Sequence, residues 1–263
     1  MKKIKLFQAD AFTDKLFAGN PAGVCPLDEW LPENTMQSIA AENNVAETAF
    51  IVPKGDAYEI RWFTPAVEVA LCGHATLATA YVLFNCLDYQ KPEIVFHSLH
   101  SGVLRVTKKD ETLFLDFPTD TLEKCDIPEQ LVKGIGIVPH EMYKGKTDYI
   151  AVVSTEEEVR NLKLDFKAIN TLEARGLIVT AKGNEVDFVS RFFGPQVGID
   201  EDPVTGSAHT SLTPIWSEKL GKKELTAKQL SKRGGSLICV YHGERVLIGG
   251  KAKLYFKGEV ELD

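Results

Sequence analysis

Two short turns, far apart in the chain, carry residue types that can bind an anion and transfer a proton. One is Cys72-Gly73-His74 and the other is Thr205-Gly206-Ser207. Each turn stands where an expected strand ends and an expected helix begins. The free N–H groups and partial positive charge of a helix N-terminus attract carboxylate or phosphate groups. We therefore expect the two turns to bind a small anion, although their polar side chains would also be explained by simple capping of the two helices.

The two turns belong to a longer repeat. The segment Arg61–Val67 (RWFTPAV) matches Arg191–Val197 (RFFGPQV), 130 positions later, and three additional residues then bring the turns into register. Because the order of expected elements agrees as well, an internal duplication explains the match better than chance similarity does. The duplication predicts an N-terminal lobe over residues 1–118 and a C-terminal lobe over residues 119–263.

Strand and helix patterns alternate in both halves. The sequence predicts helices that begin near Pro32, near His74, at Ser154 and at Gly206, the last with a kink at Pro214. Strands are predicted at residues 3–9, 48–52, 58–64, 94–99, 103–107, 112–117, 149–153, 177–180, 186–193, 237–241, 245–248 and 252–256. In contrast, Gly19-Asn20-Pro21-Ala22-Gly23 has the composition of a turn.

The helix after His74 determines the expected architecture. Its sequence, ATLATAYVLFNCL, is apolar on almost every face, so protein must enclose it. We therefore predict an α+β fold of two similar lobes, each a curled sheet around a central helix. A cleft between the lobes would be a favourable place for a ligand.

Composition excludes several classes of function. The 263 residues carry a net charge of −7 without a basic cluster, which argues against a nucleic-acid partner or an anionic membrane surface. No apolar stretch approaches the roughly eighteen residues of a membrane span. Five cysteines without a close pair indicate a reducing compartment, so we expect a cytoplasmic protein.

Four segments together resemble a known family. They are AFTDKLFAGNPAGVC, NNVAETAF, FTPAVEVALCGHATLA and DPVTGSAH. They are similar to the diaminopimelate-epimerase and proline-racemase superfamily, and more closely to the PhzF family, named for phenazine biosynthesis. This resemblance implies two halves, each a β-barrel-like sheet around a long helix, with the active site between them. It also implies a homodimer.

Racemases of this superfamily use two facing cysteines, one from each half. Cys72 occupies the first of these positions, but Thr205 occupies the second. A threonine hydroxyl is far too weakly acidic to replace a thiolate near neutral pH. The sequence therefore argues against two-thiol racemisation, and Cys72 alone is interpreted as a small buried residue of its turn.

The resemblance to PhzF proteins points instead to a carboxylate. Glu47 matches the proposed general acid/base of the family, and its apolar neighbours predict burial that would raise its pKa. His74 matches the active-site histidine, and Asp202 matches a polar residue of the opposite pocket wall. A surface glutamate and a helix-capping aspartate are the alternatives for Glu47 and Asp202. Gly73, Gly206 and Ser207 are the expected substrate-binding residues, while Asn20 is interpreted as a turn residue.

These features predict a cofactor-independent isomerase. It would shift a proton, and with it a double bond, on a small carboxylated, unsaturated cyclic metabolite; neither an organic cofactor nor a metal is indicated. Two alternatives remain open at this point. One is an amino-acid racemase or epimerase with bases other than thiols. The other is a metabolite-sensing or protein-interaction module without turnover.

Overall fold

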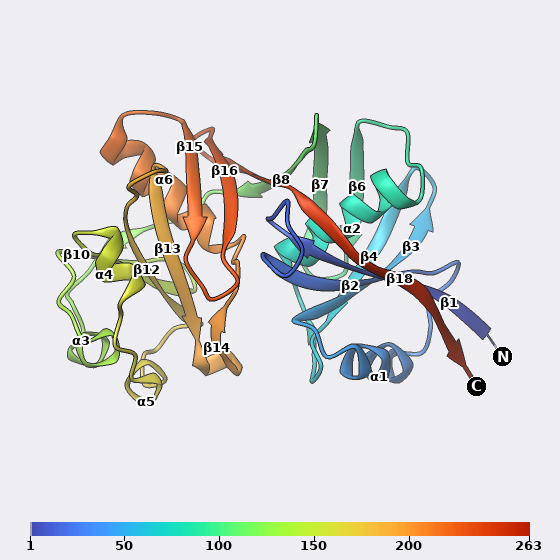
Figure 1. Cartoon of the computed structure of the whole chain (residues 1–263), viewed down its shortest axis with the longest axis horizontal. Coiled ribbons are helices and arrows are strands. Elements are labelled where there is room, and N and C mark those ends of the chain that lie inside the picture. Colours follow the sequence, from blue (N-terminus) through green and yellow to red (C-terminus); the bar gives the residue numbers. More distant parts are fainter. Residues whose placement is uncertain (1) are drawn as a thin grey trace. The chain divides into compact units, whose positions relative to one another are not determined.

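The computed structural model describes residues 2–263, which form two compact units of mixed α and β structure (Figure 1). Unit 1 comprises the chain up to Asp116 together with Gly249–Asp263, and unit 2 comprises Phe117–Ile248. The predicted α+β class is confirmed. The chain returns to unit 1 at Gly249, so a single division at residue 118 does not describe the last fifteen residues.

Unit 1 contains two helices and most of the long strands. Its helices are α1 (Glu33–Asn43) and α2 (Gly73–Cys86). Its strands are β1 (Lys2–Ala11), β2 (Asn20–Pro26), β3 (Glu47–Lys54), β4 (Ala57–Phe63), β5 (Glu68–Val69), β6 (Glu93–Ser98), β7 (Gly102–Lys109) and β18 (Ala252–Leu262). Two strands, β8 (Thr112–Pro118) and β17 (Arg245–Gly250), contain the points at which the chain passes from one unit to the other.

Unit 2 contains shorter elements. Its helices are α3 (Glu129–Ile135), α4 (Glu156–Arg160), α5 (Phe166–Ile169), the 3-10 helix η1 (Pro195–Val197) and α6 (Ala208–Leu220). Its strands are β9 (Glu123–Lys124), β10 (Glu141–Lys144), β11 (Asp148–Val152), β12 (Gly176–Lys182), β13 (Phe188–Gly194), β14 (Ile199–Asp202), β15 (Glu224–Gln229) and β16 (Gly235–Tyr241).

The same sequence of strand pairings occurs in each unit. In unit 1, β2 pairs in parallel with β3, β3 pairs antiparallel with β4, and β4 pairs antiparallel with β5 and in parallel with β6. In unit 2, β11, β12, β13, β14 and β15 repeat these pairings in the same order and directions. The main helix follows the fourth strand of each series, as α2 after β5 and α6 after β14.

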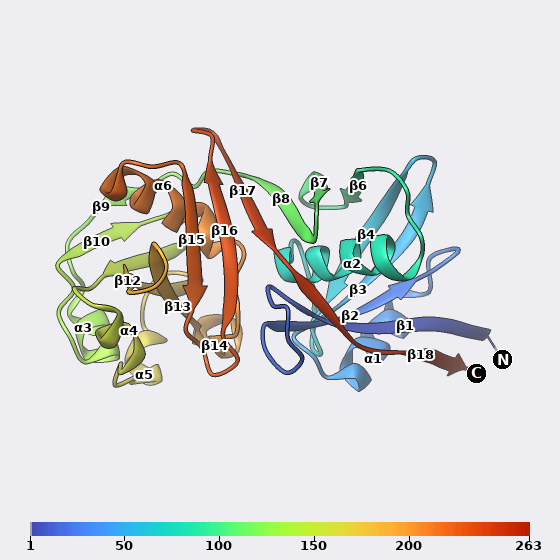
Figure 2. The same cartoon turned by 45° about the horizontal axis from the view of Figure 1, so that its top comes forward.

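Helix α2 is enclosed by strands of unit 1 (Figure 2). It contacts β1, β2, β3 and β18, and nine of its fourteen residues are buried. The prediction of an enclosed helix is confirmed. Because an apolar helix of this kind is stabilised by burial on all sides, its N-terminal turn is held in a fixed position relative to the surrounding strands.

The prediction of a turn at residues 19–23 is wrong beyond Gly19. Asn20 begins β2, which pairs antiparallel with β1 and in parallel with β3. The glycine-rich composition suggests a turn, but Gly23 is needed for the packing of two strands. A Cβ atom at this position would lie 2.8 Å from Thr48 Oγ1. The glycine thus allows β2 and β3 to approach closely, and it does not mark a loop.

Helix α6 begins two residues later than predicted and continues through Pro214 to Leu220. Proline lacks an N–H group, so the carbonyl of Thr210 loses its intrahelical partner. That carbonyl instead accepts a hydrogen bond from the Asp120 N–H at 3.3 Å. Among residues 2–263, no helix is both long and apolar enough to cross a membrane.

Candidate active site

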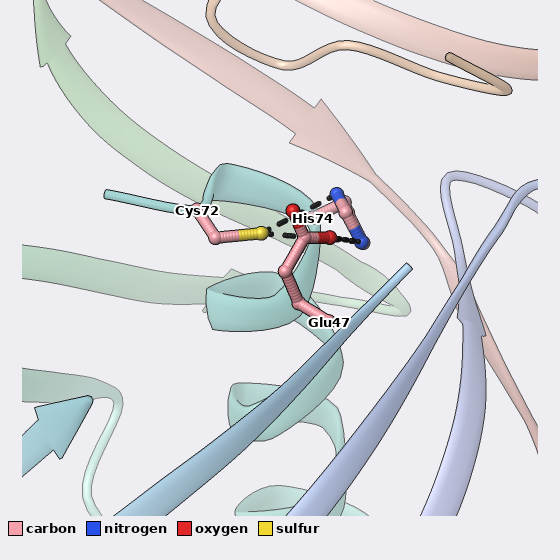
Figure 3. A group of neighbouring side chains, drawn as sticks. All are labelled: Glu47, Cys72 and His74. Carbon is pink, nitrogen blue, oxygen red and sulfur yellow. Dashed lines mark hydrogen bonds and ion pairs between the residues drawn. The ribbon is translucent and has the colours of Figure 1, made fainter. Parts of the chain in front are cut away.

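Three side chains from two neighbouring elements of unit 1 meet in a buried cluster (Figure 3). Glu47 is the first residue of β3, Cys72 is the N-cap of α2, and His74 lies in the first turn of that helix. His74 Nε2 lies 3.0 Å from Glu47 Oε2, and the two side chains are only 7% and 12% exposed. Cys72 Sγ lies 3.5 Å from His74 Nδ1. The structure thus brings together Glu47 and His74, two of the predicted catalytic residues.

The local backbone explains this meeting. Cys72 is extended, with φ −141°, and α2 starts directly after it without a side-chain hydrogen bond at its N-cap and without an acidic residue in its first turn. The imidazole of His74 contacts Glu47 and does not cap the helix. Capping is therefore not the role of His74.

Asn20 is a site residue that the sequence interpretation missed. It is fully buried at the start of β2, and its Nδ2 lies 3.2 Å from His74 Nδ1. As oriented, the amide nitrogen donates to an unprotonated Nδ1; toward the imidazolium, a rotation of the amide would present its oxygen as the acceptor. The sequence holds little sign of this contact, since the two residues are 54 positions apart and Asn20 stands between glycine and proline.

The predicted raising of the Glu47 pKa is wrong in sign. Burial by itself would raise the pKa, but the charge of His74 and hydrogen bonds from His74 and Cys72 outweigh it and hold the pKa of Glu47 below its usual 4.5. Burial would likewise lower the pKa of His74, yet its interactions with Cys72 and Glu47 hold it well above 6.5. Sequence reasoning identified the burial but not the charged neighbour.

Cys72 is buried, as predicted, but it is also part of the cluster. Burial, together with the negative charge of Glu47, raises the pKa of its thiol to about 11. Cys72 is therefore a neutral thiol near pH 7, and its S–H group is a hydrogen-bond partner of the Glu47 carboxylate. A thiol of this kind is a weak base, which agrees with the interpretation that Cys72 is not the proton-abstracting group.

The cluster also has donor types that bind metals. A carboxylate oxygen, a thiol sulfur and an imidazole nitrogen all lie within 4.8 Å of one another, and these are the ligands that zinc takes in proteins. In the structure the same atoms are engaged with one another as hydrogen-bond and ion-pair partners. The same three groups can also work as a coupled acid/base group.

The remaining predicted residues lie in unit 2. Asp202 ends β14, and its Oδ2 accepts a hydrogen bond from Thr205 Oγ1 at 2.5 Å. Ser207 is the N-cap residue of α6, but its side chain makes no capping hydrogen bond. The Ser207 hydroxyl instead accepts a bond from Arg175 Nη2 at 3.2 Å. Gly206 lies between these residues and is buried, so it contributes only backbone groups to the turn.

Arg175 and Asp148 support this second turn, and sequence reasoning identified neither residue. Arg175 donates to both carboxylate oxygens of Asp148, at 2.9 and 2.5 Å. Asp148 is buried and Arg175 is partly exposed. The pair fixes the guanidinium beside Ser207 while offsetting much of its charge.

Comparison with known proteins identifies the family. A family model described as "Phenazine biosynthesis-like protein" (PhzC-PhzF) matches residues 9–258. A protein of Pseudomonas aeruginosa named an uncharacterized isomerase is 50% identical over 260 residues, which cover 99% of this chain and 100% of that protein. The crystal structure of a PhzF family protein from Enterococcus faecalis superposes with a TM-score of 0.96 at 48% identity and covers 99% of this chain and 100% of its own.

A more distant likeness concerns the fold alone. A probable proline racemase from Agrobacterium radiobacter is 13% identical with a TM-score of 0.62, over 99% of this chain and 93% of that one. The resemblance to PhzF proteins inferred from the four sequence segments is thus confirmed: this chain belongs to the PhzF family, and it shares its fold with epimerase-like proteins.

Proposed function

We propose that this protein is an isomerase of the PhzF group that moves a proton on a small carboxylated, unsaturated substrate without an organic cofactor. The observation that carries the proposal is the buried pair of Glu47 and His74, with Nε2 and Oε2 3.0 Å apart. Support for isomerase activity in general comes from related proteins that bear this name. Support for the type of chemistry comes from the acid/base groups themselves.

In the proposed reaction, Glu47 begins as a carboxylate, since its pKa lies below 4.5. It removes a proton from a carbon atom of the substrate, and the electron pair of that C–H bond forms a new carbon–carbon double bond. The original double bond shifts its electron pair to a more distant carbon, which takes the proton back from Glu47. No electron or atom is gained or lost overall, so the reaction is an isomerisation.

His74 has a separate role in this proposal. Its raised pKa keeps the imidazole protonated near neutral pH, and the positive charge and Nε2–H group orient the Glu47 carboxylate. When Glu47 holds the substrate proton, the same imidazolium favours prompt release of that proton. His74 thus keeps the carboxylate in the form that starts each turnover, at the cost of a weaker base.

Substrate binding is proposed to use the two turns. Gly73 would contribute a backbone N–H at the start of α2, where no side chain caps the helix. Gly206 and Ser207 would bind polar groups of the substrate in the same manner at α6, and Asp202 would accept a hydrogen bond from a substrate amine or hydroxyl. These assignments rest on the chemistry of each turn and on the family motif.

The proposal is tested by proton exchange. A panel of cyclic unsaturated carboxylic acids is incubated with the protein in D₂O, and deuterium incorporation is followed by NMR. We expect exchange with wild type and at least a 100-fold loss with Glu47→Gln, because the amide cannot accept the proton. The matched control is Glu42→Gln, which changes an exposed glutamate of α1. Equal exchange by wild type and Glu47→Gln would contradict the role of Glu47.

The same experiment separates the racemase alternative. Exchange with inversion at a stereocentre, without movement of a double bond, would identify a racemase or epimerase. A shifted double bond in the recovered product is the expected outcome.

A further inference from the structure

A buried glutamine organises the turn that contains Asp202. Gln229, the last residue of β15, is 1% exposed. Its Oε1 accepts a hydrogen bond from the backbone N–H of Thr205 at 2.8 Å. Its Nε2 donates to the backbone carbonyl of Asp202 at 2.8 Å and to Thr205 Oγ1 at 3.2 Å. One amide group therefore binds both ends of the Asp202–Thr205 turn.

The partners fix the direction of every hydrogen bond in this group. A backbone N–H can only donate and a backbone carbonyl can only accept, so the two ends of the Gln229 amide cannot be exchanged. Thr205 Oγ1 accepts a hydrogen bond from Gln229 Nε2, so the hydroxyl donates its own hydrogen to Asp202 Oδ2 at 2.5 Å. Asp202 Oδ2 is thus placed as an acceptor.

A third contact holds Thr205 from the other side. His209 Nδ1 lies 2.9 Å from the Thr205 carbonyl, which requires the proton to be on Nδ1. Burial lowers the pKa of His209 to about 4, so the ring is neutral near pH 7. The N–H, carbonyl and hydroxyl groups of Thr205 therefore each have a partner inside unit 2.

We propose that Thr205 and Gln229 are positioning residues whose function is to fix the carboxylate of Asp202 in the orientation that binds substrate. This inference rests on the proposed function, which gives Asp202 a hydrogen bond to a substrate amine or hydroxyl. A fixed carboxylate loses less side-chain freedom when substrate binds, which favours binding.

The test compares Thr205→Val, which has nearly the same shape but no hydroxyl, with Thr205→Ser, which keeps the hydroxyl. Crystal structures of both variants provide a measurement that needs no substrate. We expect the Asp202 carboxylate to leave its wild-type rotamer in Thr205→Val and to keep it in Thr205→Ser. If Thr205→Val is insoluble, Thr205→Ala serves the same comparison with a smaller side chain.

Kinetics provide the functional measurement, with the acid that exchanges deuterium as substrate. Thr205→Val should lower kcat/KM about tenfold, mainly through KM, and Thr205→Ser should restore it, since a hydrogen bond to a charged group is lost and regained. The matched control is Thr226→Val. Thr226 also donates its hydroxyl proton to an aspartate, Asp187, but the pair is exposed. This control should leave kcat/KM unchanged.

The outcomes separate this inference from the proposed function. An unchanged Asp202 rotamer and unchanged kcat/KM in Thr205→Val would overturn the positioning role. Undiminished exchange by Asp202→Asn would overturn the substrate-binding role of Asp202 in the proposed function, and the positioning inference with it. A loss in Asp202→Asn without any loss in Thr205→Val would overturn the positioning inference alone.

Discussion

At the scale of single residues, the site depends on opposite charges that share a buried location. Glu47 and His74 each carry a burial cost when charged, and each offsets that cost for the other. Removing one partner leaves the other charge buried and unpaired, which is strongly destabilising. The pair therefore links the proposed acid/base chemistry to the stability of the protein.

This link predicts a pH dependence. The depressed pKa of Glu47 contributes stability above its usual value of 4.5, and this contribution is lost as pH falls through the lower folded value. The raised pKa of His74 contributes stability below 6.5, and this contribution is lost as pH rises through the higher folded value. Both contributions are fully present only between about 4.5 and 6.5.

We therefore expect the stability difference between wild type and His74→Asn to be greatest in this range and to shrink toward acid and alkaline pH. Urea unfolding from pH 3 to 9 measures it. His100→Asn, at an exposed histidine, is the control and should follow wild type. Parallel pH profiles for wild type and His74→Asn would show that the pair does not set the stability.

Sequence reasoning identified Glu47 and His74 but not the residues that hold them. The motif segments contain both side chains, and the family resemblance assigns their roles. Sequence reasoning missed the roles of Asn20 and Gln229, because a hydrogen bond between distant positions leaves no periodic pattern in the chain. It also missed the effect of the Glu47 and His74 charges on each other's pKa. Apolar neighbours in sequence indicate that a side chain is buried, but they do not show which ionised group lies opposite it.

At the scale of elements, sequence reasoning predicted the features that depend on residues close together in the chain. The helix predicted to begin at Ser154 is present as α4, and Thr155 and Glu158 form a capping box at its start. Short strands were missed, since β5, β9, β10 and β14 have two to four residues and show no alternation. Strand β2 was missed because its glycine and proline residues have the composition of a turn.

The capping box yields a second prediction. Thr155→Ala should lower the free energy of unfolding by about 1 kcal/mol, because the Glu158 N–H loses its acceptor. Thr155→Ser keeps the oxygen and should restore most of the stability. Denaturation by urea at neutral pH compares the three proteins. Equal stability of the alanine and serine variants would contradict the capping role.

Strands β4 and β13 support the duplication inferred from the 130-residue offset. Arg61 in β4 donates to both carboxylate oxygens of Glu68, and its guanidinium lies over Phe63. Arg191 in β13 does the same with Glu201 and Phe193. We infer that both units descend from one ancestral unit, since strand pairings and side-chain contacts recur together.

At the scale of the whole molecule, unit 1 depends on both ends of the chain. Strand β18 pairs antiparallel with β1 from Lys2↔Leu262 to Ala11↔Ala252. Val260 and Leu262 also pack against a core cluster of unit 1 that includes Ile4 and Met36. The sequence predicted the last strand but not its partner, because the order of elements alone does not show a return to the first unit.

A chain that ends at Lys251 tests this dependence. We expect amide protons of β1 and α2 to lose protection from hydrogen exchange, since β1 loses its β18 partner and the core loses apolar cover. Amides of β12 and β13, within unit 2, should exchange as in the full chain. Hydrogen exchange measured by mass spectrometry compares the shortened chain with the full chain. Unchanged protection of β1 in the shortened chain would contradict the prediction.

The pairing of β1 with β18 also orders events during synthesis. Unit 2 is one continuous segment, so all of its residues are available once Ile248 has left the ribosome. Unit 1 begins first but lacks a strand until β18 has been synthesised. The proposed catalytic pair of Glu47 and His74 therefore belongs to the unit that begins first and is completed last. A chain that has not yet reached β18 would carry these two residues without the complete unit that holds them.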